Sequence, residues 1–147
     1  MTEIIRMPVD VYEDIKKVDK SLVGRSVVFL PEPERTNELI KIVEWYLQLD
    51  KPNLERATEF ASLIRGVERT AQLEKVLKIY VSQGELLCAN SMAKEYMERS
   101  LTIEELITMF RFHVDKEDVD GAKGAAKEIV KHYEKINSPV PSEPHTK

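Results

Sequence analysis

The residues best suited to chemistry in this sequence are one cysteine and three histidines. Cys88 stands in a stretch whose apolar residues have helical spacing, so we expect it to pack against neighbouring side chains rather than act as a nucleophile. His132 follows Glu128 by four residues, but two ligands on a charged helix face do not make a metal centre. His113 falls at a predicted helix end, where an imidazolium favours the negative end of the helix dipole. We therefore predict neither a metal nor a cofactor.

Two short motifs resemble ligand-binding loops but lack what those loops require. Residues 118–121 (DVDG) resemble the middle of a calcium loop, yet Lys116 and Lys127 stand where oxygen ligands are needed. Residues 121–124 (GAKG) resemble the loop of a nucleic-acid-binding KH domain, but they lie inside a helical pattern of apolar residues. The phosphate-loop pattern is absent from the sequence. We therefore predict a protein that is not an enzyme.

The composition is typical of a globular chain that folds without disulfides. Of its 147 residues, 42% are hydrophobic and 33% charged, and the formal net charge is −4. This balance disfavours a general nucleic-acid-binding surface, which is normally basic. A single cysteine favours a reducing compartment. Pro8 and Asp10 interrupt the first residues before an apolar segment develops, so we expect no signal peptide, no membrane contact and a cytoplasmic location.

Apolar residues spaced three and four apart predict six helices between residues 36 and 136. Thr102 with Glu105 fits a capping box, in which the hydroxyl and the carboxylate each accept a backbone N–H of the first turn. Ser82 with Glu85 fits the same pattern. The starts predicted for the first helix of each pair are Thr36, Thr70 and Thr102.

The two ends of the chain are less regular. Residues 8–22 predict a helix. Residues 26–30 (SVVFL) could form a short irregular or extended segment, since β-branched side chains favour strands, and they could equally form a buried helical turn ending at Pro31. The Pro-rich tail, residues 137–147, is predicted to be disordered.

The predicted helices repeat at intervals of 32 to 34 residues. Six of the eight alanines form pairs four residues apart, a spacing that makes a shallow groove into which a neighbouring helix fits closely. We therefore expect these alanines to be buried. The pairs are Ala57 and Ala61, Ala89 and Ala93, and Ala122 and Ala126.

Helical hairpins at this interval resemble the tetratricopeptide-repeat class of α-α solenoids over about residues 36–136. The resemblance implies an all-α superhelix of three to four stacked helical hairpins in a single domain, residues 1–136. Residues 35–136 would form three hairpins and residues 1–34 a degenerate N-terminal unit. Tyr12 and Gly24 support that unit, since they precede Tyr46 and Ala57 by 34 and 33 residues. Members of this class bind protein segments on the face made by their first helices.

These patterns predict a protein–protein interaction module that binds a partner segment or helix on the face of the first helices. Trp45, Ile79 and Arg111 each precede an aromatic residue of the repeat, so we expect them to align on successive helices. Tryptophan and arginine dominate many interfaces, and cationic side chains recognise carboxylates. The predicted partner-binding residues are Lys41, Trp45, Lys75, Lys78, Ile79 and Arg111.

Three alternatives stay open at this point. Trp45 suits a core position or a dimer contact as well as a partner-binding site. A homo-oligomeric structural protein would use the open apolar ends of a short solenoid. A regulator that contacts nucleic acid would use a local basic cluster of Arg56, Arg65 and Arg69.

Overall fold

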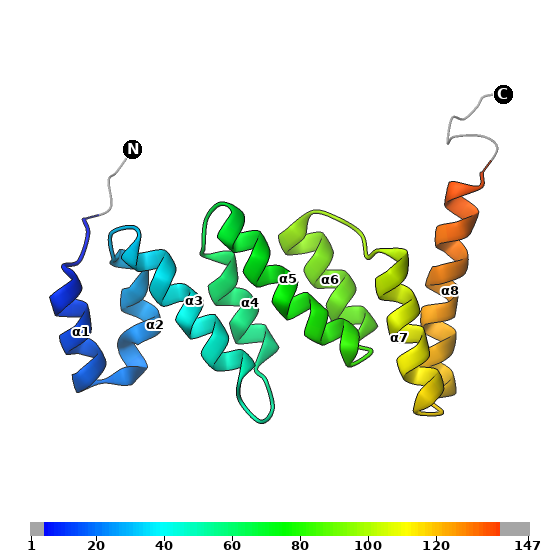
Figure 1. Cartoon of the computed structure of the whole chain (residues 1–147), viewed down its shortest axis with the longest axis horizontal. Helices are drawn as coiled ribbons and strands as arrows, with labels where there is room; N and C mark the ends of the chain where they lie inside the picture. The colour runs from blue at the N-terminus through cyan, green and yellow to red at the C-terminus, as the bar shows by residue number, and fades with distance from the viewer. Residues whose placement is uncertain (1–4, 139–147) are drawn as a thin grey trace. The chain divides into compact units, whose positions relative to one another are not determined.

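The computed structural model describes residues 5–138, and that part of the chain is all-α, as predicted (Figure 1). It contains eight α-helices and no strand within this range. None of these described helices is both long and apolar enough to span a membrane. Most of the predicted tail, residues 139–147, lies outside the described range. The helices are α1 (Val9–Val18), α2 (Val23–Ser26), α3 (Glu34–Leu47), α4 (Leu54–Ser62), α5 (Val67–Ser82), α6 (Leu86–Met97), α7 (Ile103–Asp115) and α8 (Val119–Ile136).

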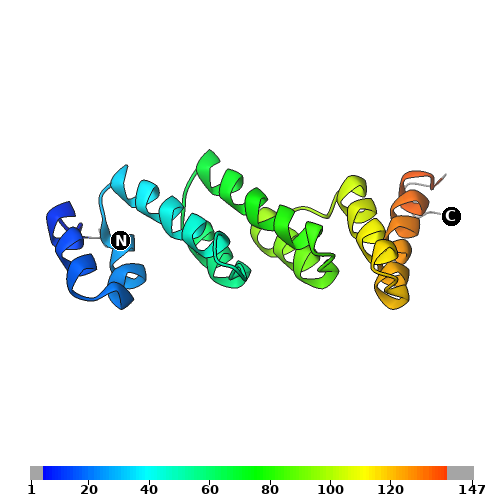
Figure 2. The ribbon, with the colours of Figure 1, turned by 60° about the horizontal axis from the view of Figure 1, so that its bottom comes forward.

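The chain divides into two compact units, residues 1–76 and 77–147, and the division falls within α5. In the first unit α3 and α4 form a helical hairpin, and in the second unit α7 and α8 form another. Within each hairpin the two helices lie side by side in both views (Figures 1 and 2). Each unit contains its own buried apolar side chains. Examples are Leu39 and Ile64 in the first unit and Met92 and Met109 in the second.

The core of the first unit joins the N-terminal segment to the α3–α4 hairpin. Tyr12 from α1 and Leu39 from α3 are fully buried in one cluster with Ile64, which follows α4. Val27 and Leu30 complete that cluster. Because these two residues lie three apart, a helical turn directs both side chains into the same core.

The extended segment expected at residues 26–30 is therefore wrong. Ser26 ends α2, and Val27–Phe29 form a single 3-10 turn, so the alternative of a buried helical turn before Pro31 is confirmed. The predicted N-terminal helix is also shorter than expected. It ends at Val18, and Lys20–Leu22 form a separate 3-10 turn. The carboxylate of Asp19 accepts hydrogen bonds from the Ser21 amide and hydroxyl, which favours a new turn there.

The alanine pairs are buried in two of the three predicted places. All four alanines of α4 and α6 that were predicted to be buried are inaccessible to solvent. In α8 the prediction is wrong in part, because Ala125 is the buried residue whereas Ala122 and Ala126 are only half-buried. α8 is the last helix of the described range, and Ala122 and Ala126 line a shallow hollow beside α7.

The capping box predicted at Thr102 is confirmed. The Thr102 hydroxyl accepts a hydrogen bond from the Glu105 amide at 3.1 Å, and the Glu105 carboxylate accepts one from the Thr102 amide at 2.8 Å. Arg99 also donates to both Glu105 oxygens, each at 3.1 Å. Burial opposes the ionised form of Glu105, but the hydrogen bonds from Arg99 and Thr102 outweigh it, so the pKa of this carboxyl is lowered.

The other predicted helix starts are wrong. Thr36 and Thr70 lie within the first turns of α3 and α5, which begin at Glu34 and Val67. Thr36 cannot cap the helix because its amide and its hydroxyl both donate to the Glu32 carboxylate of the preceding turn, at 3.1 and 2.7 Å.

The second predicted capping box is also wrong. Ser82 is the last residue of α5, and its hydroxyl donates to the Ile79 carbonyl at 2.8 Å. α6 begins later, at Leu86, and its N-cap residue makes no side-chain capping bond. Between the two helices the chain turns at Gly84, whose φ of +69° favours glycine.

Gly84 also lies directly against α7. A Cβ atom at this position would stand 2.5 Å from Cδ2 of Phe112 and 2.7 Å from Nε2 of His113. The His113 ring contacts the Gly84 carbonyl oxygen at 2.8 Å and the Asp118 carboxylate at 3.0 Å. His113 thereby links the turn after α5 to the turn after α7 within the second unit.

We predict that Gly84→Ala lowers the free energy of unfolding by about 2–4 kcal/mol, because the new methyl group meets both a positive φ and the Phe112 ring. Gly124→Ala in α8 is the matched control. Its Cβ would have only Leu86 nearby, at an ordinary contact distance of 3.8 Å. The control should raise stability by about 0.5–1 kcal/mol through helix propensity. Urea denaturation measures both, and equal effects of the two substitutions would contradict this packing.

We predict that Thr102→Ala lowers the free energy of unfolding by about 1 kcal/mol, since it removes the N-cap acceptor. Thr70→Ala changes an exposed residue inside α5 and should raise stability by about 0.5 kcal/mol. Thermal and urea denaturation distinguish the two variants. A loss of stability in Thr70→Ala as large as in Thr102→Ala would support a helix start at Thr70 and contradict the observed one.

Candidate functional site

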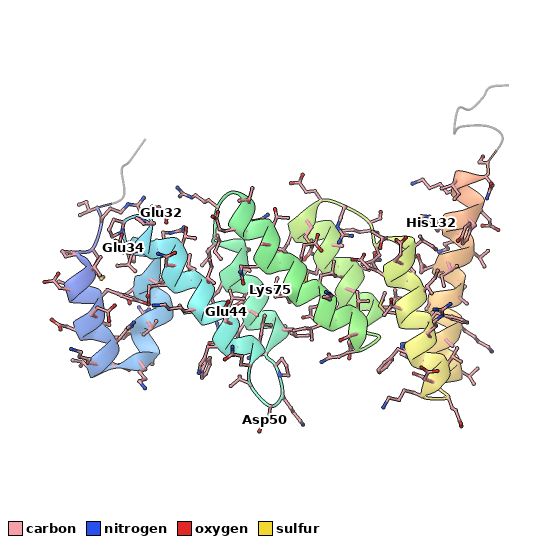
Figure 3. All side chains as sticks on the ribbon, viewed as in Figure 1. Glu32, Glu34, Glu44, Asp50, Lys75 and His132 are labelled. Atoms are coloured by element: carbon pink, nitrogen blue, oxygen red, sulfur yellow. The ribbon has the colours of Figure 1, made fainter. Side chains whose placement is uncertain are left out.

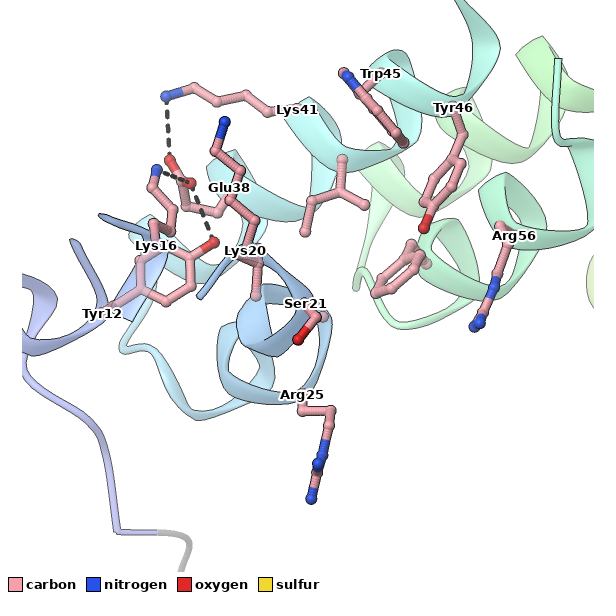
Figure 4. Close-up of a pocket in the computed structure, with 14 residues that line it drawn as sticks. Tyr12, Lys16, Lys20, Ser21, Arg25, Glu38, Lys41, Trp45, Tyr46 and Arg56 are labelled. Carbon is pink, nitrogen blue, oxygen red and sulfur yellow. Dashed lines mark hydrogen bonds and ion pairs between the residues drawn. The ribbon is translucent and has the colours of Figure 1, made fainter. Parts of the chain in front are cut away.

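The first unit contains an open groove of about 720 Å³. Side chains from the segment α1–α2 form one side of it, and side chains of α3 and α4 form the other (Figure 4). All of its lining residues belong to the first unit. It is therefore defined by contacts within that unit alone.

The groove is lined by cationic side chains although the chain as a whole is acidic. Within the described residues 5–138, Glu38 is the only carboxylate that lines the groove, whereas five lining residues are cationic and the formal net charge of the chain is −4. Cationic side chains that line a concave surface attract anionic groups. The cationic residues are Lys16, Lys20, Arg25, Lys41 and Arg56.

Glu38 connects α1 to α3 at the floor of the groove. One of its oxygens accepts hydrogen bonds from the Tyr12 hydroxyl at 3.3 Å and from Lys16 Nζ at 3.1 Å, and the other accepts from Lys41 Nζ at 3.1 Å (Figure 4). The Glu38 side chain is only 13% exposed. Two ammonium groups therefore neutralise a carboxylate that is largely removed from water.

The titration of this cluster follows from its surroundings. Burial opposes ionisation of Glu38, but hydrogen bonds from Lys41 and Lys16 and the charges of both outweigh it, so its pKa is lowered. Burial raises the pKa of Tyr12, and the charge of Glu38 raises it further. Tyr12 therefore stays a neutral donor while Glu38 stays a charged acceptor.

Two of the cations that line the groove have no carboxylate partner among residues 5–138. Lys20 and Arg25 are exposed, and neither forms an ion pair with any residue of the described range 5–138. Arg56, by contrast, pairs with Glu59 at 3.2 Å on an exposed surface. Figure 4 shows the Lys20 side chain extending toward the same part of the groove as Glu38. Lys20 and Arg25 are thus the cations available to an anionic group from outside.

Aromatic side chains form the other half of the groove. Trp45 is 58% exposed and lies edge-on to Tyr46, with ring centroids 5.0 Å apart. Tyr46 in turn stacks on Phe60 of α4 at 5.9 Å. A Cβ atom on Gly24 would come within 2.8 Å of the Phe60 ring, so the absence of a side chain lets α2 reach α4. Trp45 consequently presents a large apolar surface at a groove whose floor is already packed.

Lys41 and Trp45, two of the predicted partner-binding residues, line the groove. Lys75 lies in the same unit, where its ammonium group is 3.5 Å from the Glu44 carboxylate (Figure 3), and it does not line the groove. Lys78, Ile79 and Arg111 belong to the second unit, in which Lys78 and Arg111 are exposed and Ile79 is half-buried. The role of these four residues in binding stays a prediction.

Sequence reasoning missed Lys16, Lys20 and Arg25 as groove residues. The sequence feature that could have identified them is a cluster of basic residues in the irregular N-terminal segment. The sequence does not show, however, that this segment folds against α3. The arginine cluster predicted for nucleic acid takes part in local structure at two of its positions. Arg56 pairs with Glu59, and Arg69 donates to the Ser62 carbonyl oxygen at 3.3 Å.

The cysteine and the histidine that were considered above for catalysis or metal binding do not line the groove. Cys88 is exposed, so the expected packing role is wrong: the buried stripe of α6 runs through Ala89, Met92 and Ala93, one position away. Within residues 5–138 no group of three or more His, Cys, Asp or Glu side chains could hold a metal ion. His132 lies on α8 of the second unit (Figure 3).

Comparison with protein-family models, with curated proteins and with solved structures finds no match for this chain. Inference about function therefore rests on the groove and its side chains.

We predict that Glu38→Gln lowers the free energy of unfolding by about 1–3 kcal/mol at neutral pH, because hydrogen bonds from two lysines lose their charged acceptor. The folded-state pKa of Glu38 is lowered, so its contribution is complete above the unfolded value of about 4.3 and disappears as the pH falls through the folded value. The difference between wild type and variant should therefore shrink in acid.

Glu59→Gln is the matched control for this substitution. Its partner Arg56 and Glu59 itself are both 58% exposed, so this change should alter stability by less than about 0.5 kcal/mol. Urea denaturation between neutral and acidic pH measures both variants. Equal stability of the two at neutral pH would show that Glu38 does not hold α1 to α3.

Proposed function

We propose that this protein is a non-catalytic protein–protein interaction module that binds a segment of a partner protein in the groove of the first unit. The observation that carries the proposal is Trp45, an exposed tryptophan at the edge of an open groove. Exposed aromatic side chains beside concave surfaces are typical of binding hot spots, since they bury a large apolar area on contact.

The proposal includes a helical-repeat arrangement similar to that of tetratricopeptide repeats. It is supported by two helical hairpins, α3–α4 and α7–α8, and by the buried alanines of α4 and α6 at corresponding positions. In this proposal residues 1–136 form one repeat domain and the first helices of the hairpins contact the partner. The proposal also includes a cytoplasmic location, which is supported by the single cysteine of the chain.

Site-specific photo-crosslinking tests the proposal directly. A photoreactive phenylalanine analogue at Trp45, introduced in the native cell, should capture one or a few discrete heterologous proteins. The same analogue at Val67, which is 79% exposed and outside the groove, is the control and should not capture them. Mass spectrometry of the adducts gives the result. Identical adducts from both positions, or none from position 45, would contradict partner binding in the groove.

A second candidate, a homo-oligomeric protein, is favoured by a separate observation on α8. Val130, Tyr133 and Ile136 are 54%, 47% and 61% exposed, although all three are large and apolar. Such residues are frequent in contacts between copies of a chain. In the crosslinking experiment this candidate predicts adducts between two copies of the protein, with the analogue placed at Tyr133.

A further inference from the structure

We propose that the segment bound in this groove is acidic, with aspartate or glutamate residues beside one large apolar side chain. This inference rests on the proposed function, because it specifies the chemistry of the segment that the groove receives.

The cations of the groove fall into two groups. Lys16 and Lys41 are occupied by Glu38, which holds one of them with each of its oxygens at 3.1 Å. Lys20 and Arg25 are exposed and have no ion-pair partner among residues 5–138. An incoming carboxylate therefore finds its free partners on the short segment from η1 (Lys20–Leu22) into α2.

Glu38 sets a limit on how much negative charge the groove accepts. Among residues 5–138 it is the only acidic residue that lines the groove, and its charge offsets one of the two lysine charges beside it. Lys20 and Arg25 can balance the charge of a few ligand carboxylates, whereas the further charges of a dense polyanion would be repelled by Glu38. Glu13 and Glu59, which pair with Lys16 and Arg56, add further negative charge at the edges.

The aromatic residues also favour a peptide over nucleic acid. Single-stranded nucleic acid binds through successive bases stacked on exposed rings. Here Tyr12 is fully buried and Tyr46 is half-buried and stacked on Phe60. Trp45 alone among the groove's aromatic residues is exposed. One exposed ring suits one apolar anchor side chain of a peptide.

The chain offers a direct reporter of binding, because Trp45 is its only tryptophan. The probe is a synthetic glutamate-rich peptide with one central leucine and no aromatic residue. A matched peptide carries glutamine in place of every glutamate, and oligouridylate serves as the polyanion. Each is titrated against the full chain while tryptophan fluorescence is recorded.

The glutamate peptide should bind at least about tenfold more tightly than the glutamine peptide, and its affinity should fall as salt is added. Charge reversal by Lys20→Glu together with Arg25→Glu should weaken the glutamate peptide about tenfold or more. The control Lys51→Glu changes an exposed lysine that does not line the groove, and it should alter affinity less than about twofold.

A further variant separates recognition from structure. Glu38→Gln removes the negative charge of the groove and frees Lys41, while Lys16 keeps its pair with Glu13. The variant should therefore bind the glutamate peptide about threefold more tightly even though the folded state is less stable. Circular dichroism confirms that the variant is folded at the temperature of the titration. If it does not fold, the comparison of the Lys20 and Arg25 reversal with Lys51→Glu decides the question alone.

Several results would overturn the inference. Equal affinity for the two peptides, tighter binding of oligouridylate, or an unaltered affinity in the Lys20 and Arg25 reversal would each exclude an acidic segment as the ligand. Absence of binding by any peptide would also exclude it. The proposed function is judged separately, by whether the photoreactive group at position 45 captures a heterologous protein.

Discussion

The ionic cluster around Glu38 is the constraint on which the groove depends. Its carboxylate accepts from Tyr12 and Lys16 of α1 and from Lys41 of α3, and the Tyr12 ring is part of the core below. Removing the Glu38 charge would leave the buried Tyr12 hydroxyl and the half-buried Lys16 without their charged acceptor, whereas Lys41, whose side chain is 71% exposed, would stay hydrated. This cluster and the buried core that Tyr12 shares with Leu39 and Ile64 together hold the N-terminal segment beside α3, and hence form one side of the groove.

Small residues set the distances between elements in both units. Gly24 lets α2 approach Phe60, and Gly84 lets the turn after α5 approach Phe112. In each case an aromatic ring fills the space that a side chain would otherwise occupy. Gly24 and Phe60 line the same groove as Trp45, which is 58% exposed.

The sequence predicts what is local and repeats along the chain. Helical spacing identifies the all-α class and the alanines that pack in α4 and α6, and the capping box at Thr102 needs only residues of one turn. Sequence patterns do not reveal contacts between residues that are far apart along the chain. The start of α3 depends on Glu32 of a preceding turn, and the cations of the N-terminal segment line the same groove as Trp45 and Lys41 only because α1 folds against α3.

Hydrogen–deuterium exchange of the full chain, with and without the glutamate-rich peptide, tests the central claim most directly. If an acidic segment binds between the N-terminal segment and the α3–α4 hairpin, amide exchange should slow in α1, α2 and α3 and stay unchanged in α7 and α8. Protection confined to α7 and α8, or no protection at saturating peptide, would contradict the assignment of the groove as the binding site.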